Sequence, residues 1–218
     1  MLRSNYIMMK KRILMSALGV LTGAVAVGFF KLAAFGVDPF QSLMSGTDKL
    51  VPLSFGILYV IVNALLLIFA LVFDRHYIGI ATFINLFLLG YIVEFTQWLL
   101  CLIFPAAGIV VRTVFFVVGF ISLCFSSSLY ITADLGVSTY DAIAIVMAEK
   151  WKLGKFKYIR IATDSVCIVI GIAMFLLGSG AVTDIPTFVG IGTILTAFFM
   201  GPLIDFFNRT VSRPMLKM

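Results

Sequence analysis

The chain contains 218 residues, of which 62% are hydrophobic and 12% are charged, and its formal net charge is +6. A water-soluble domain usually has about 25% charged residues, so this composition excludes a soluble protein and predicts one that lies in a lipid bilayer. The basic residues gather in the termini and the short loops, where anionic lipid headgroups account for them better than nucleic acid does.

Six apolar stretches are long enough to cross about 30 Å of hydrocarbon at about 1.5 Å per residue. In chain order they are Ile13–Phe35, Phe55–Phe73, Ile78–Leu99, Thr113–Leu135, Ile161–Gly178 and Thr187–Phe207. The first stretch is too long for the apolar core of a signal peptide, so we expect it to be retained as a membrane span.

The two halves of the chain repeat each other. The sequence KLAAFGVDPF at Lys31–Phe40 returns as ITADLGVSTY at Ile131–Tyr140, and GIAT at Gly79–Thr82 returns as GIGT at Gly190–Thr193. Repeats in an apolar chain of this size are typical of transporters and channels.

The repeats divide the chain into a cytoplasmic N-terminal segment (1–12), a first repeat (13–103), a second repeat (113–207) and a cytoplasmic tail (208–218). Each repeat has three spans, an odd number, so the second enters the membrane from the opposite side to the first. With both termini in the cytoplasm, 13 of the 16 Lys and Arg residues lie on the inner side, as the positive-inside rule requires. We therefore predict an all-α membrane protein with six transmembrane helices in two inverted repeats of three.

The turns after the first and fourth spans carry the signals of a helix start. Asp38 is placed to cap a helix with Pro39 at its first position, and Ser138 to cap one with Asp141 at its third. Each repeat is therefore predicted to contain a short interfacial or re-entrant helix after its first span. The caps serve the helices alone in one interpretation. In the other, the helix starts bind an anionic ligand or the polar part of a substrate.

Further polar residues lie in the predicted second span and at the start of the fifth. Asn63 is near the centre of its span, where an unpaired amide is costly, and Asp164 is its counterpart in the second repeat. Arg160 precedes Asp164 by one helical turn, so the two either form an ion pair at the helix entrance or take part in substrate or proton transfer. The candidate substrate and pathway residues are Asp38, Pro39, Asn63, Ser138, Tyr140, Asp141, Arg160 and Asp164.

The sequence contains no recognisable catalytic or metal-binding motif. It has no hydrolase, zinc-protease or nucleotide-binding motif, and a single histidine offers no constellation for catalysis. Cys101, Cys124 and Cys167 lie in or beside apolar spans without paired spacing, so we assign them to packing. We therefore predict no enzymatic activity, no catalytic residue, no metal site and no cofactor.

The motifs resemble those of the bacterial YczE/YyaS/YitT group of small integral membrane proteins, most closely its YczE branch. The resemblance runs from Gly19 to Phe207. It rests on Gly36–Phe40 (GVDPF), Ala133–Gly136 (ADLG) with Tyr140 and Asp141, Arg160 with Asp164, Gly190–Thr193 (GIGT), and Gly201 with Pro202. One departure is Ser138-Thr139, where the group usually has Gly-Pro before the short helix. The resemblance implies a multi-pass bacterial membrane protein and supplies no substrate.

The leading hypothesis is a small secondary transporter or facilitator of an unknown small molecule in the bacterial cytoplasmic membrane, with its pathway between the repeats. One alternative is a substrate-binding membrane component of a larger transporter, and another is an accessory membrane protein that does not transport. The expected partners are the lipid bilayer and a small molecule, without nucleic acid, and a homo-oligomer remains open.

Overall fold

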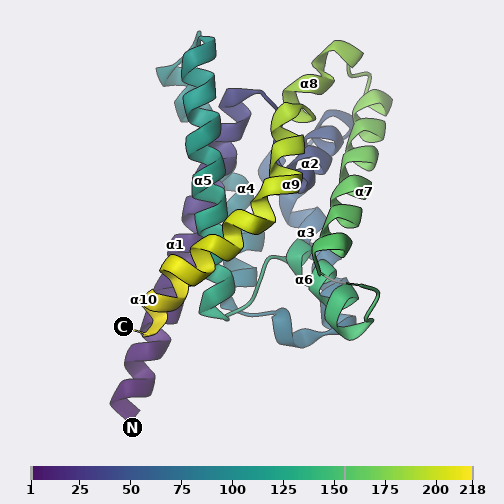
Figure 1. The fold of residues 1–218 in the computed structure, drawn as a ribbon. Coiled ribbons are helices and arrows are strands. Elements are labelled where there is room, and N and C mark those ends of the chain that lie inside the picture. Colours follow the sequence, from purple (N-terminus) through teal and green to yellow (C-terminus); the bar gives the residue numbers. More distant parts are fainter. Residues whose placement is uncertain (1, 155, 218) are drawn as a thin grey trace.

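A computed structural model describes residues 2–154 and 156–217, and every regular element in these residues is helical. The elements are α1 (Leu2–Ala33), α2 (Pro39–Leu50), α3 (Phe55–Phe73), η1 (Arg75–Tyr77), α4 (Ile80–Ile103), α5 (Ile109–Ala133), α6 (Thr139–Ile145), η2 (Val146–Lys150), α7 (Phe156–Leu177), η3 (Val182–Asp184), α8 (Ile185–Phe188), α9 (Ile191–Phe207), η4 (Asn208–Ser212) and α10 (Arg213–Lys217). Both ends of the chain lie at the same end of the molecule (Figure 1).

Six helical segments of the described chain are long and apolar enough to cross a membrane, which confirms the predicted number of spans. Their outer faces are apolar: Leu65, Val110 and Val169 each expose more than 60% of their surface. Hydrocarbon suits these side chains, and the helices satisfy their own backbone polar groups, as a bilayer interior requires.

The predicted sixth span, Thr187–Phe207, is interrupted in the structure. Helix α8 ends at Phe188 and α9 begins at Ile191. Between them Gly190 is extended, and its N–H donates to Thr193 Oγ1 at 3.2 Å. This hydrogen bond makes Gly190 the start of a new helix, an arrangement that Gly79 and Thr82 repeat at the start of α4.

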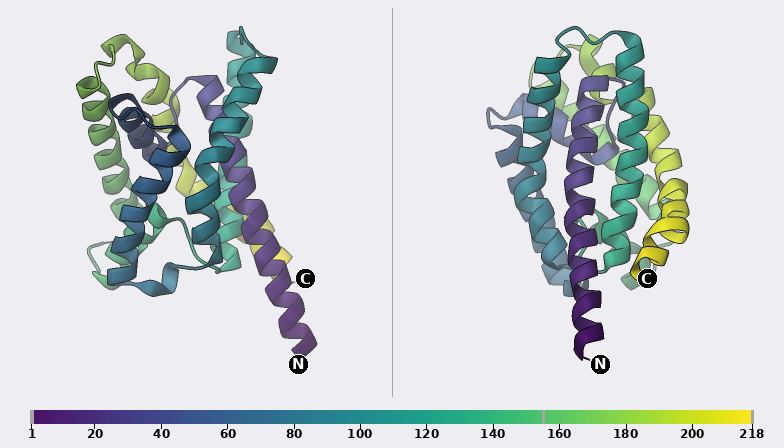
Figure 2. Two further views of the ribbon diagram at one scale, coloured as in Figure 1. Left: turned by 180° about the vertical axis from the view of Figure 1, so that it is seen from behind. Right: turned by 90° about the vertical axis from the view of Figure 1, so that its left-hand side faces the viewer.

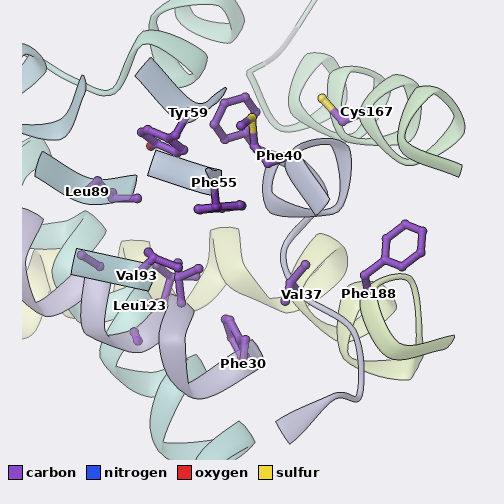
Figure 3. Close-up of a cluster of buried hydrophobic side chains, with 14 of the residues drawn as sticks. Phe30, Val37, Phe40, Phe55, Tyr59, Leu89, Val93, Leu123, Cys167 and Phe188 are labelled. Carbon is purple, nitrogen blue, oxygen red and sulfur yellow. The ribbon is translucent and has the colours of Figure 1, made fainter. Parts of the chain in front are cut away.

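Buried aromatic side chains form the core where α2 and α3 meet α1 and α4. Phe30, Phe40 and Phe55 are each at most 6% exposed, and they belong to one cluster with Tyr59 and Leu89. Figure 3 shows Phe40, Phe55 and Tyr59 together between these helices. The core therefore holds the short helix α2 against the spans.

Helix α1 lies at the centre of one side of the bundle. It packs along α5 and α4 (Figure 2, right). The small residue Gly19 lets the backbones approach, and Ser126 Oγ of α5 donates to the Gly19 carbonyl at 2.6 Å. Small residues with such hydrogen bonds are the usual means by which membrane helices associate.

The turns that follow α1 and α5 have the same backbone geometry. Gly36 has a φ of 98° and Gly136 a φ of 106°, conformations that only glycine adopts without steric cost. Each glycine also lies against a helix start of the other half. A Cβ on Gly36 would lie 2.5 Å from the Gly190 nitrogen, and one on Gly136 would lie 2.5 Å from the Gly79 nitrogen.

Backbone hydrogen bonds also join each of these turns to the other half, in the same way on both sides. The Val37 N–H donates to the Phe188 carbonyl at 3.1 Å, and the Val137 N–H donates to the Tyr77 carbonyl at 3.0 Å. In addition, the carbonyls of Phe35 and Leu135 accept the N–H groups of Gly192 and Ala81, at 2.7 and 3.1 Å. The turn of each half therefore binds the third span of the other half.

The short helices also pack across the halves. Helix α2 lies along α7, while α6 lies against α3 (Figure 1). The closest approach on the α2 side is between Gly46 and Gly171, where a Cβ on Gly46 would lie 2.0 Å from the Gly171 carbonyl oxygen. Each short helix therefore packs against a span of the other half as well as against its own half.

Candidate binding site

Both short helices begin with the predicted caps. Asp38 Oδ1 accepts the N–H of Gln41 at 3.2 Å, and Ser138 Oγ accepts the N–H of Asp141 at 3.1 Å. Pro39 occupies the first position of α2, where its missing N–H costs nothing. The N–H groups of Gln41 and Asp141 thus donate to the capping side chains. These groups belong to the helix starts that the second interpretation had assigned to an anionic ligand.

A cavity of about 690 Å³ lies between the two halves, with lining from α1, α2, α5, α6, α7 and α9. Of the predicted residues, those that line it are Asp38, Pro39, Ser138, Tyr140, Asp141, Arg160 and Asp164. The sequence left open whether the turns of the two repeats meet, and in the structure they reach one cavity.

Asn63, the remaining candidate, lies outside the cavity lining. Its amide nitrogen donates to the Tyr59 carbonyl at 2.8 Å, and its amide oxygen accepts the hydroxyl of Thr139 at 2.5 Å. The buried amide is therefore satisfied, and it fastens the start of α6 to α3.

Arg160 joins two carboxylates of the cavity wall. Its guanidinium pairs with Asp141, and its Nε lies 3.2 Å from Asp164 Oδ1. The sequence had predicted the Asp164 contact but not the Asp141 contact, which depends on the approach of α6 to α7. Tyr130 and Ser138 hydroxyls also donate to Asp141 Oδ2, each at 2.7 Å. The Asp141 carboxylate is thus satisfied by one cation and two hydroxyls.

Tyr140 connects this network to α2. Its hydroxyl donates to Asp164, while the Arg160 guanidinium lies 4.4 Å from the centre of its ring. On α2, the ring of Phe40 stacks on the Tyr140 ring with a centroid separation of 4.9 Å and an interplanar angle of 15°. The two short helices therefore touch through aromatic side chains at the cavity wall.

The pKa values of Asp38 and Asp141, the carboxyl groups of the two turns, are shifted in opposite directions. Burial raises the pKa of Asp38 to about 7, because the Gln41 N–H and the more distant Arg160 only partly offset it and Asp164 and Asp141 add to the rise. Burial acts on Asp141 too, but the Arg160 guanidinium and the Tyr130 and Ser138 hydroxyls more than offset it and lower the pKa of Asp141. Asp141 is thus held ionised, whereas Asp38 changes charge near neutral pH.

Several cavity residues were not predicted from the sequence. They are Gln41, Asn85, Tyr130 and Thr196, which come from four different elements. Tyr59 and Asn85 bond to each other, hydroxyl to amide oxygen, at 3.0 Å. Gln41 could have been found, because it shares the first turn of α2 with Asp38. The others are ordinary polar residues of apolar spans, and only the fold brings them together.

The cavity has a buried end and an open end. Gln41, Tyr59 and Thr196 are each at most 3% exposed, whereas Glu149 and Asp205 are exposed lining residues. Asp205 lies in the last turn of α9, which leads through η4 to α10 beside the C-terminus (Figure 1). Within the described residues, no group of three His, Cys, Asp or Glu side chains could hold a metal ion.

A family model described as "Family of unknown function (DUF6198)" matches residues 10–209 of the chain. The chain belongs to this family. It is 25% identical over 202 residues to an uncharacterized protein of Haemophilus influenzae (strain ATCC 51907 / DSM 11121 / KW20 / Rd). The matched residues cover 92% of this chain and 84% of that protein.

A second relative is the uncharacterized membrane protein YczE of Bacillus subtilis (strain 168), 23% identical over 175 residues, or 79% of this chain and 74% of the relative. The similarity confirms the expected resemblance to the YczE branch. No solved structure matches the chain. The six apolar helices and a relative named as a membrane protein together indicate a multi-pass membrane protein, and the site must be interpreted from its own geometry.

Proposed function

We propose that this member of the family is a small secondary transporter or facilitator, with the cavity between its halves as the substrate pathway. The observation that carries the proposal is the cavity of about 690 Å³ to which the turns of both halves contribute. Pockets of about 300–1,000 Å³ are the size that holds small molecules. Transporters commonly bind substrate between two repeats, next to the starts of interrupted helices.

Inverted symmetry of the halves belongs to this proposal. A two-fold axis in the membrane plane would exchange α1 with α5, α2 with α6, α3 with α7 and α4 with α9. The packing agrees, since α2 lies on α7 while α6 lies on α3. The turn contacts agree residue by residue, because Gly36 meets Gly190 as Gly136 meets Gly79.

In this proposal the cavity opens towards the cytoplasm. The exposed lining residue Asp205 lies near the C-terminal end of the chain, and the distribution of basic residues favours a cytoplasmic position for both termini. Access from the other side requires α2 to move, because its residues Phe40 and Gln41 close the buried end together with Tyr59. In this proposal, α2 and α6 are re-entrant helices that alternate as gates.

Cysteine accessibility tests the proposal without a known substrate. In a variant lacking Cys101, Cys124 and Cys167, Thr196→Cys places a thiol at the buried end of the cavity. A membrane-impermeant maleimide is applied to right-side-out and to inverted vesicles. Thr183→Cys and Lys152→Cys, at exposed loops, report the two sides of the membrane.

A transporter that exchanges access labels Thr196→Cys from both sides, faster from the side that labels Lys152→Cys. Labelling from one side only would contradict the proposal and favour a binding subunit or an accessory protein. Labelling of Lys152→Cys in right-side-out vesicles would overturn the assignment of the termini to the cytoplasm.

A further inference from the structure

The first turn of α2 contains one buried hydrogen-bond acceptor that has no donor within the described residues. Gln41 is 3% exposed, lines the cavity, and its Oε1 makes no hydrogen bond in the described structure. Asp38 lines the cavity beside it and uses only Oδ1. A buried acceptor without a donor costs about 1–3 kcal/mol. The turn thus offers hydrogen-bond acceptors to a ligand and leaves the cost uncompensated until one binds.

Charges around the cavity favour the same kind of ligand. Three carboxylates, Asp38, Asp141 and Asp164, face one guanidinium, that of Arg160. Arg160 is shared by the two carboxylates of its own network, so Asp38 has no ion pair in the described residues. At the open end Glu149 adds a further carboxylate, whereas Asp205 is paired with Arg209 one helical turn on. A surplus of one sign in a cavity with apolar walls attracts ions of the other sign.

The rest of the lining is mostly apolar. It includes Val20, Val27, Leu89, Leu123, Ile131 and Met200. A fully hydrated inorganic cation would gain nothing from these side chains, whereas an amphipathic ligand would lose apolar surface to them. The donors that match Asp38 and Gln41 therefore belong to a molecule that also has an apolar body.

We infer that the cavity binds an organic cation, a primary ammonium or guanidinium group on an apolar body, whose N–H donors bond to Asp38 and Gln41. The inference rests on the proposed function, since it names the substrate class of the same cavity. Charge-assisted hydrogen bonds of this kind are about twice as strong as neutral ones. The Arg160 network remains intact and serves as the wall that holds α6 and α7 at the site.

Three matched indoles test the charge preference. Tryptamine is a cation, tryptophol its neutral analogue and indole-3-acetate an anion of similar size. Their binding to the purified full-length protein in lipid nanodiscs is measured by calorimetry at a pH above 7. We expect tryptamine to bind about tenfold or more tightly than tryptophol, and indole-3-acetate to bind most weakly. Equal affinities, preference for the anion or no tryptamine binding would overturn the inference.

Two substitutions locate the binding. Asp38→Asn keeps a good helix cap but removes the charge, so it should weaken tryptamine about tenfold and leave tryptophol unchanged. Gln41→Met should weaken tryptamine without lowering stability, because it replaces an unpaired acceptor by an apolar group of similar shape. Asp48→Asn is the matched control, a carboxylate on the same helix outside the cavity. If Asp48→Asn weakens tryptamine as much as Asp38→Asn does, the assignment to this turn fails.

A transport assay distinguishes failure of the inferred substrate class from failure of the proposed transporter function. Uptake of tryptamine into proteoliposomes, beside protein-free vesicles, measures transport, while calorimetry measures recognition alone. Specific binding without flux would keep the substrate class and contradict the transporter. Two-sided labelling of Thr196→Cys with no preference for tryptamine would keep the transporter and overturn the substrate class.

Discussion

Asp38 combines a helix cap with a half-buried charge, and these two roles respond differently to pH. The cap needs only an acceptor oxygen, which Asn also supplies. The charge is disfavoured because burial, with Asp141 on α6 and Asp164 on α7 nearby, outweighs the favourable effects of the Gln41 N–H and Arg160. The aspartate is therefore retained at a cost in stability, which is expected of a residue that serves a ligand.

We expect Asp38→Asn to stabilise the protein above neutral pH and to lose this advantage in acid. The pKa of Asp38 is about 7 in the fold against 3.8 for the free side chain, so the folded state binds the proton more tightly. Protonated Asp38 therefore contributes its full stabilisation of the fold below a pH of 3.8, the pKa of the free side chain. This contribution is lost as the pH rises through about 7, the pKa in the fold. Melting temperatures of both proteins at about pH 5 and about pH 8 measure the change. A pH-independent difference would contradict it.

The Arg160 network makes a second prediction, because the structure confirms the expected Asp164 partner and adds Asp141 as a second one. With only Asp164 in view, Asp164→Asn would leave Arg160 unpaired, but the structure keeps Asp141 beside it. Arg160→Gln instead leaves two poorly exposed carboxylates without a cation, and losing one partner of a buried pair costs about 3–5 kcal/mol. We therefore expect Arg160→Gln to lower the unfolding free energy more than Asp164→Asn. Equal losses, measured by denaturant titration in detergent, would contradict the shared role.

At the scale of elements, the sequence predicts features that depend on neighbouring residues, whereas contacts between residues distant in the chain could not be predicted. The six spans and both caps follow from apolar length and from Asp38-Pro39 and Ser138, because they depend on neighbours in the chain. The Phe40–Tyr140 stack and the Arg160–Asp141 pair join residues 19 or more positions apart in sequence. Helix propensity and capping signals do not predict such contacts. The sequence repeat did indicate that the two turns have equivalent positions in the fold.

The two turns should respond equally to one added methyl group. Gly36→Ala and Gly136→Ala each force a side chain into a left-handed conformation and towards backbone nitrogen atoms 2.5 Å away. We expect each to lower stability by more than about 1 kcal/mol, and both by similar amounts. Gly108→Ala is the control, since its Cβ meets nothing within 4 Å. Thermal unfolding in detergent compares the three, and a loss in only one turn would contradict their equivalence.

At the scale of the whole molecule, the halves are joined by far more than the loop between α4 and α5. Helix α1 packs along α5, α2 along α7 and α6 on α3, so the principal interfaces cross the boundary of the repeats. The connecting loop at residues 104–108 is largely exposed and makes none of these contacts. Chain continuity at this loop should therefore matter little once the protein has folded.

A protease site inserted at Gly108 tests this interdependence and the topology together. The loop lies at the end opposite both termini (Figure 2), so an impermeant protease should cut it in right-side-out vesicles and leave it intact in inverted ones. After cutting, a tag on one half should recover both halves in mild detergent, because the α1–α5 and α2–α7 contacts hold them together. The cut protein should also keep its Asp38-dependent binding of tryptamine. Halves that separate on extraction would show that the interfaces between repeats are too weak to define a common cavity.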